Sequence, residues 1–221
     1  MEQSRNKVVT YHWKDVVKRG LFSISILLIS FTYPLLNQSR GNANSVYTFV
    51  DKFIPFNRFF ILPYISWYIF MAIFSAILCI LDKERYFKLL ITLNIGMITC
   101  YVIYYFYPTY VPRPIITGTD FFSNLVLSLY AADNPYNCFP SIHVLNSVLI
   151  ALYIYESEKV YKYIKAICIV MSVSIILSTM FIKQHYFADV LSGVIFALIL
   201  YLSFRNIKFN FSKQHTTIYI D

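Results

Sequence analysis

The hydrophobic residues of this chain gather in six long runs that are separated by more polar stretches. The runs cover residues 21–36, 59–81, 89–107, 141–155, 164–182 and 187–204. A helix of about 20 mostly apolar residues crosses the hydrocarbon core of a bilayer, and inside lipid every backbone polar group must find its partner within the helix. The pattern therefore predicts an all-α, polytopic membrane protein with six transmembrane helices.

The longest polar connection, residues 108–140, opens with three prolines, Pro108, Pro112 and Pro114. Proline lacks a backbone donor and biases the residue before it toward extended backbone, so these residues should end the third helix. The middle of the connection, residues 121–132, is apolar enough to form a short helix. We expect that helix to lie on the membrane surface.

The sequence contains no internal repeat and no sign of a second domain. We divide it into residues 1–60 (an N-terminal tail, the first transmembrane helix and an outer loop), residues 61–206 (a helical core) and residues 207–221 (a cytoplasmic tail). Basic residues precede the first hydrophobic run, as they do in a signal peptide. The long leader and the length of the run favour a retained anchor, with cleavage near Ala43 as the alternative.

Lysine and arginine are distributed unevenly between the two sides of the predicted membrane. Fourteen of the 19 fall in the N-terminal tail, the loops at residues 82–88 and 156–165, and the C-terminal tail. The other side has Arg40, Lys52, Arg58, Arg113 and Lys183. Short cytoplasmic segments carry the excess of basic residues, so both termini should be cytoplasmic. The connection at 108–140 then faces outward, and we expect a protein of the cytoplasmic membrane with any site there on the outer face.

The composition agrees with a membrane protein and argues against nucleic-acid binding. Hydrophobic residues make up 58% of the chain and charged residues 14%, against about 25% charged in soluble domains. The formal charge of +8 is spread between apolar runs instead of forming a basic face. Three of the four cysteines lie in the apolar runs and only Cys138 lies in an outer loop, so no disulfide framework is expected.

Two of the predicted helices begin on the same side of the membrane with polar sequences. One begins at Pro140-Ser141-Ile142-His143 and the other at the segment from Lys183 to Asp189. A helix N-terminus presents unpaired N–H groups and the positive end of the helix dipole, so two that meet at one level favour an anion. The sequence thus predicts an anion site at the outer face.

The residues near these helix starts are suited to phosphoryl chemistry. His185 and Asp189 are four residues apart and share a helical face, so the carboxylate can orient one ring nitrogen and leave the other free as a base or nucleophile. His143 is the candidate second acid or base. Arg113 and Lys183 are the cations nearest in sequence, and they could neutralise a phosphate as a fork and as a point charge.

Three segments together resemble the signatures of the type 2 phosphatidic acid phosphatase superfamily, which are K-x6-R-P, P-S-G-H and S-R-x5-H-x3-D. In this chain they read Phe106-x6-Arg113-Pro114, Pro140-Ser141-Ile142-His143 and Ser178-Thr179-x5-His185-x3-Asp189. P-S-x-H alone is a weak pattern, but three motifs in order and with matching internal spacing are a strong one. The similarity extends from about the third helix to the sixth.

The resemblance implies a role for each matching residue. In the superfamily the third-motif histidine attacks phosphorus, its aspartate orients it, and the second-motif histidine protonates the leaving oxygen. Carried over, His185 is the nucleophile, Asp189 its orienting residue and His143 the acid and then the base. Arg113 would bind phosphate oxygens with help from Ser141, and Lys183 would add positive charge. No cofactor or metal is implied, and the partners are a phosphorylated lipid substrate and the surrounding membrane lipids.

Three positions depart from the signatures, because Phe106, Thr179 and Ile142 replace lysine, arginine and glycine. The loss of two cations should weaken binding of a doubly charged phosphomonoester more than that of a singly charged phosphodiester. The segment from Lys183 to Tyr186 and the second motif without glycine are similar to inositol phosphorylceramide synthases, and the H-Y-x-x-D core is similar to sphingomyelin synthases. Those relatives transfer a head group to an alcohol, which makes transfer the alternative to hydrolysis.

Other readings of the same residues make different predictions. His143, His185 and Asp189 could form a metal site with two histidines and one carboxylate, which chelation would reveal. A transporter could use them to line a pathway, although no charged residue lies near the middle of a predicted span. A vanadium haloperoxidase shares the motifs but should keep the missing cations. We therefore predict a metal-independent phosphatase that hydrolyses a lipid phosphate ester through a phosphohistidine.

Overall fold

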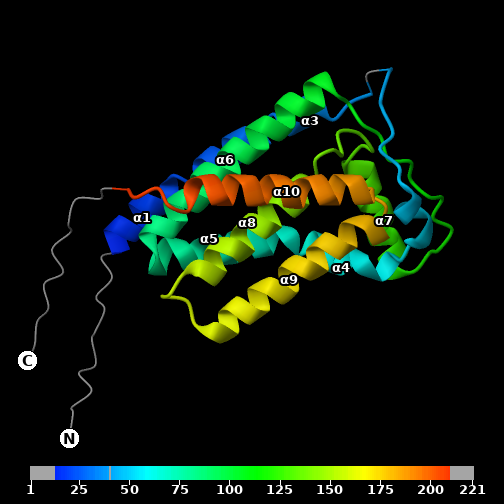
Figure 1. The fold of residues 1–221 in the computed structure, drawn as a ribbon. Helices are drawn as coiled ribbons and strands as arrows, with labels where there is room; N and C mark the ends of the chain where they lie inside the picture. Colours follow the sequence, from blue (N-terminus) through cyan, green and yellow to red (C-terminus); the bar gives the residue numbers. More distant parts are fainter. Residues whose placement is uncertain (1–12, 40, 210–221) are drawn as a thin grey trace, which may run out of the picture.

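The structure is a computed structural model, and it describes residues 13–39 and 41–209 (Figure 1). Its α-helices are α1 (Trp13–Leu21), α2 (Ile24–Ser30), α3 (Tyr33–Leu36), α4 (Ile61–Ile65), α5 (Trp67–Leu81), α6 (Lys83–Phe106), α7 (Phe121–Ala132), α8 (Ile142–Glu156), α9 (Lys162–Phe181) and α10 (Phe187–Phe204). Two 3-10 helices, η1 (Phe49–Phe53) and η2 (Arg58–Phe60), precede α4. The described residues form no β-strand, so the predicted all-α class is confirmed.

Five helical segments of the described chain are long and apolar enough to cross a membrane. They are Trp13–Leu36, Arg58–Leu81, Lys83–Phe106, Lys162–Phe181 and Phe187–Phe204. α8 has 15 residues, which corresponds to about 22 Å of helix against a hydrocarbon core of about 30 Å. An integral membrane protein built of helices is thus supported, and the count of six spans stays a prediction.

α8 is the central helix of the bundle. It packs against α5, α6, α9 and α10, and its residues Leu145, Leu149 and Tyr153 are fully buried. Because most of its apolar side chains are buried against other helices, with Tyr155 as an exposed exception, we expect α8 to contact little lipid. The fourth hydrophobic run of the sequence therefore reflects a protein core as much as a membrane span.

The predicted helix boundaries differ from the structure where local polar contacts extend or break a helix. α6 begins six residues before the predicted start at residue 89, because the Asp82 carboxylate accepts the backbone N–H of Arg85 at 3.4 Å and caps the helix. The first span is divided into α1, α2 and α3, with Pro34 in the first turn of α3. Hydropathy registers neither feature.

The bundle has two ends that differ in structure. One end, here called the Asp82 end, contains the α5–α6 turn, the α8–α9 loop, the start of α1 and the end of α10 (Figure 1). The other end, here called the α7 end, contains α4, α7 and the starts of α8 and α10 (Figure 1). α7 forms at the residues predicted for it, is capped by Asp120, and packs on η2 and α4.

Candidate active site

The starts of α8 and α10 meet at the α7 end. The Ser141 N–H donates to the Asp189 carbonyl oxygen at 3.1 Å, which ties one helix start to the other. A Cβ added to Gly193, one turn further along α10, would lie 2.9 Å from the Ser141 carbonyl oxygen. The absence of a side chain at Gly193 therefore permits the close approach that brings His143 and His185 to one place.

The structure brings together the three residues predicted to be catalytic. His185 Nδ1 lies 3.4 Å from Asp189 Oδ2, and the Asp189 carboxylate is completely buried. The same Oδ2 accepts the backbone N–H of Tyr186 at 2.8 Å, which fixes the carboxylate at the start of α10. The ring centroids of His143 and His185 are 6.0 Å apart, so a group the size of a phosphate can lie between the two rings.

The His143 imidazole is held by aromatic contacts. Its ring stacks on Tyr64 at 4.7 Å and lies against Trp67 at 4.4 Å. Both aromatic residues belong to the segment of α4 and α5, which is remote in sequence from α8. These contacts restrict rotation of the His143 side chain.

His143 and His185 line a common cavity of about 310 Å³. Its wall also contains seven aromatic side chains of phenol or indole type, from the first span, α4, α5, α6 and the connection at 108–140. They are Tyr33, Tyr64, Trp67, Tyr68, Tyr101, Tyr104 and Tyr136. Asp133 is the one carboxylate among the described lining residues, and none of these residues is lysine or arginine.

The three residues predicted to bind substrate lie around this cavity instead of lining it. The buried Ser141 caps α8, because its Oγ accepts the N–H of Val144 at 3.4 Å. The Arg113 guanidinium lies over the Tyr130 ring at 4.5 Å and donates from Nη1 to the Lys183 carbonyl oxygen at 3.4 Å. Arg113 Nε and Nη2 are buried and have no hydrogen-bond partner.

Lys183 is engaged elsewhere in the structure. Its ammonium group donates to the carbonyl oxygen of Ile54, between η1 and η2, and its backbone has a positive φ of 53°. Burial lowers the pKa of the Lys183 ammonium, while the nearby Asp51 carboxylate opposes that shift. The use of Lys183 as a phosphate ligand stays a prediction, and it requires the side chain to leave Ile54.

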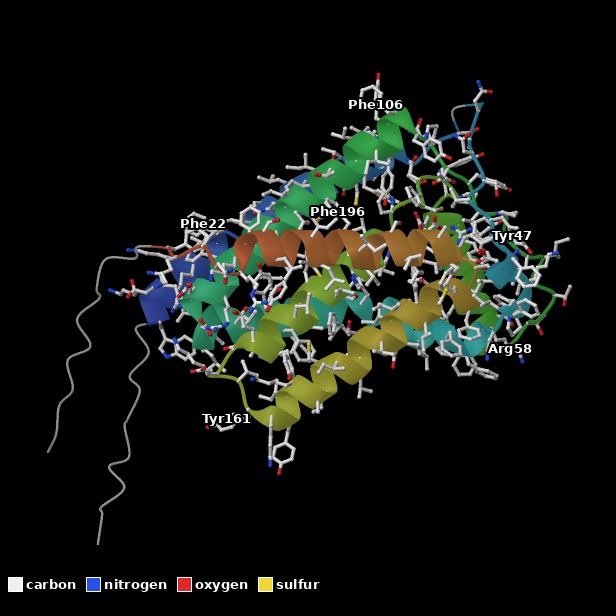
Figure 2. All side chains as sticks on the ribbon, viewed as in Figure 1. Phe22, Tyr47, Arg58, Phe106, Tyr161 and Phe196 are labelled. Atoms are coloured by element: carbon white, nitrogen blue, oxygen red, sulfur yellow. The ribbon has the colours of Figure 1, made fainter. Side chains whose placement is uncertain are left out.

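The two positions that lack the superfamily cations have other surroundings. Phe106 is 78% exposed at the tip of α6, and Figure 2 shows its ring directed away from the other helices. Thr179 is fully buried, and its hydroxyl donates to the Ile176 carbonyl oxygen within α9 at 2.8 Å. Neither residue lines the cavity that contains His143 and His185, so neither side chain replaces a missing cation there.

The structure places three further residues at the cavity that the sequence did not single out. Gln184 is buried beside His185, and its Nε2 has no hydrogen-bond partner. Trp67 presents a buried, unpartnered Nε1. Burial raises the pKa of the Asp133 carboxyl above its ordinary value, although the nearby Arg113 opposes the shift. The position of Gln184 within the third motif was the only sequence signal for any of them.

The geometry gives no support to the metal-site alternative. Among the residues that the structure describes, no group of three histidine, cysteine, aspartate or glutamate side chains is arranged to hold a metal ion. Independence of the reaction from metal ions stays a prediction.

Comparison with known proteins identifies the family of this helical bundle. The family model of the PAP2 superfamily matches residues 42–203, which include all three motifs and the cavity residues from α4 onward. No curated protein and no solved structure matches the chain. Members of the superfamily are lipid phosphate enzymes of the phosphatase or phosphotransferase type. With its motifs, helical fold and paired histidines, the chain belongs to the PAP2 superfamily.

Proposed function

We propose that this protein hydrolyses a lipid phosphate ester through a phosphohistidine on His185, at the outer face of the membrane. The observation that carries the proposal is the pairing of His143 and His185 across one cavity, with the Asp189 carboxylate behind His185. One histidine is thereby oriented by a carboxylate, and the other faces it across the space for the substrate. This is the arrangement that in-line phosphoryl transfer between a nucleophile and a leaving group requires.

In the first step, Nε2 of His185 attacks phosphorus. Asp189 lies against Nδ1 and favours the tautomer with its proton there, which leaves the Nε2 lone pair free. The new N–P bond forms as the bond between phosphorus and the lipid oxygen breaks. His143 gives its proton to that oxygen, so the lipid leaves as a neutral alcohol.

In the second step, water attacks the phosphohistidine. Neutral His143 now takes a proton from the water as the O–P bond forms and the N–P bond to His185 breaks. The phosphate product departs, and both histidines return to their starting protonation states. His143 thus serves as the acid in the first step and as the base in the second.

The phosphate is held by neutral donors and one arginine in place of the missing cations. Arg113 offers two unpaired nitrogens, and its contact to the Lys183 carbonyl places it beside the segment that carries His185. Gln184 contributes an unpartnered amide N–H₂ at the cavity wall. The first N–H groups of α8 add the positive end of a helix dipole. We therefore expect singly charged diesters to bind better than dianions.

An apolar groove supports a lipid substrate. It encloses about 670 Å³ between the first span and α5, and it shares Ser30, Trp67 and Tyr68 with the catalytic cavity. Ala72 and Ala76 leave room along its floor on α5. A hydrocarbon chain in this groove would place its phosphate ester beside His143 and His185.

Transfer of the phosphoryl group to an alcohol is the second candidate function. The described wall of the cavity is aromatic and contains no lysine or arginine, which suits a neutral hydroxyl compound better than a second anion. A phosphohistidine can react with water or with any alcohol held in line with it. The predicted similarity to inositol phosphorylceramide synthases belongs with this alternative.

Partition of a labelled head group separates hydrolysis from transfer. The purified protein is given a phospholipid with a labelled phosphate, with and without inositol, glycerol or diacylglycerol, and the label is followed. Hydrolysis predicts label in the free phosphorylated head group in every case. Transfer predicts label in a new diester, which is a lipid when diacylglycerol is the acceptor and water-soluble when inositol or glycerol is the acceptor. Quantitative movement of the label into such a diester, with the free phosphorylated head group at background, would replace the hydrolase assignment with the transferase.

A further inference from the structure

Asp133 is held at the cavity wall by residues of the first span. Its Oδ1 accepts hydrogen bonds from Asn37 Nδ2 at 2.7 Å and from Tyr33 Oη at 3.1 Å. The Asn134 side chain donates to the Asn37 carbonyl oxygen at 2.9 Å, which docks the end of α7 on α3. The carboxylate is therefore fixed in orientation, and no described residue donates to its second oxygen, Oδ2.

A fixed carboxylate is an unusual group beside a phosphate site. An ionised Asp133 repels a phosphate group, and burial already disfavours its charged form. Arg113 interacts with it electrostatically, but no ion pair within 4 Å joins the two. A substrate with a positive charge next to Oδ2 would offset both the repulsion of the phosphate and the cost of burying the charged carboxylate.

The rest of the cavity wall suits the same kind of charge. Tyr33, Tyr68, Tyr101 and Trp67 line the same cavity as Asp133. Aromatic faces attract ammonium groups, most strongly where water is excluded, and cages of this kind bind quaternary ammonium ions. A diol or polyol would donate hydrogen bonds to Asp133 but would make no use of the aromatic side chains.

We propose that the carboxylate of Asp133 and the surrounding aromatic side chains form a subsite for the cationic head group of a zwitterionic phosphodiester lipid. This rests on the proposed function, in which the phosphate lies between His143 and His185. The phosphate then occupies one end of the cavity and the ammonium the other. Tyr33 and Asn37 lie before residue 42, where the match to the superfamily model begins, so part of this subsite is built by a segment outside the family match.

Two lysolipids with the same acyl chain test the subsite. Lysophosphatidylcholine and lysophosphatidylglycerol each carry one phosphodiester charge, and only the first has an ammonium group. Their affinities are measured with the His185→Ala protein in dodecyl maltoside, so that no turnover occurs. We expect the choline lipid to bind roughly tenfold more tightly, the ratio that cation–π and charge contacts of this kind give.

Variants of the same protein identify the source of the preference. Asp133→Asn keeps an acceptor for Tyr33 and Asn37 but removes the charge, so the preference should fall to within about twofold. Asp120→Asn makes the same change at the exposed start of α7, where either residue caps the helix, and should leave the preference intact. Tyr68→Leu removes an aromatic face whose residue is 67% exposed, so it tests the cage without disturbing the core.

The outcomes test the proposed subsite and the proposed function separately. Equal binding of the lysolipids, tighter binding of the glycerol lipid, or a choline preference that survives both Asp133→Asn and Tyr68→Leu would overturn the subsite. Turnover by the wild-type protein is measured separately on the same lipids. If the choline preference holds but no lipid is cleaved, the subsite stands and the proposed function fails. If lipids are cleaved but the choline preference is absent, the proposed function stands and the subsite fails.

Discussion

The two ends of the helical bundle both bury charged groups, but the hydrogen bonds and ion pairs of these groups differ between the ends. At the Asp82 end, the Asp82 carboxylate accepts from Ser157 Oγ at 2.7 Å and from Arg85 Nη1 at 2.9 Å. Lys88 bonds to Glu84 at 2.8 Å and to the Arg205 carbonyl oxygen at 2.7 Å. These contacts join α6 to the α8–α9 loop and to the end of α10.

At the α7 end, several buried polar groups have no hydrogen-bond partner. His185 Nδ1 is 3.4 Å from Asp189 without an aligned hydrogen bond, and Asp189 Oδ1 has no partner. Arg113 and Gln184 also present unpaired nitrogens. An unpaired buried group costs about 1–3 kcal/mol, so a fold keeps several in one place only where something else compensates. The contacts of the Asp82 end therefore hold the helices together, and the unpaired groups of the α7 end support the proposed substrate site there.

The largest effect is expected at His185. His185→Ala removes the atom that bonds to phosphorus, so no covalent intermediate can form and turnover should fall by at least about a thousandfold. The measurement is release of labelled phosphate or head group from a phospholipid. Retention of more than a tenth of the wild-type rate would mean that the unpaired groups of the α7 end serve another purpose.

A matched pair of aspartate substitutions compares the two ends directly. Asp189→Asn should lower turnover by about a hundredfold or more, because an amide no longer favours the reactive tautomer of His185. Its effect on thermal unfolding should be small, since the Asp189 carboxylate has an oxygen without a partner. A variant that unfolds readily but keeps normal turnover would show that Asp189 serves stability and not catalysis.

Asp82→Asn is the other half of that pair. Burial alone would raise the pKa of Asp82, but Ser157 and Arg85 hold it below its ordinary value, so the carboxylate stabilises the fold at neutral pH. The substitution should lower the free energy of unfolding by about 1–3 kcal/mol and leave kcat unchanged.

The stabilising contribution of Asp82 should depend on pH in a defined direction. A lowered carboxyl pKa stabilises the fold above the unfolded-state pKa of about 3.9, and the benefit disappears as pH falls through the folded-state pKa. The difference in stability between wild type and Asp82→Asn should therefore shrink in acid. A difference that is constant from neutral to acid pH would contradict the assigned network.

The smallest effect concerns the apolar groove between the first span and α5. Ala76→Trp should fill part of the groove between α5 and the first span, and raise KM several-fold for substrates with long acyl chains but not for short ones. Ile73→Trp places the same bulk on α5 at an exposed residue outside the groove and is the control. Equal effects of the two variants at every chain length would remove the groove from the substrate path.

The sequence predicted those features that depend on local patterns. Hydropathy located the five helical segments that are long enough to span a membrane, and the three motifs identified a superfamily that the family match confirms. The four-residue spacing of His185 and Asp189 placed them on one helical face, where the structure has them 3.4 Å apart. Such features are carried by periodicity within one segment, so they can be read without knowing the fold.

The features that the sequence did not predict depend on contacts between distant segments. Asp133 reaches the cavity because Tyr33 and Asn37, about 100 residues earlier, bind its carboxylate. Lys183 is drawn to the carbonyl of Ile54 by the way the η1–η2 segment packs on the α9–α10 turn. A single sequence contains no local signal for either contact, and only the assembled bundle shows them.

Direct detection of the covalent intermediate tests the central claim. The His143→Ala protein is mixed with a nitrophenyl phosphate ester, whose leaving group needs no proton, and quenched in alkali, where phosphohistidine survives. Without the His143 base the intermediate should persist, giving a burst of about one nitrophenol per chain and a phosphoryl group on the His185 peptide. Absence of both burst and modified His185, from a preparation whose wild-type counterpart turns over the same ester, would contradict the phosphohistidine mechanism.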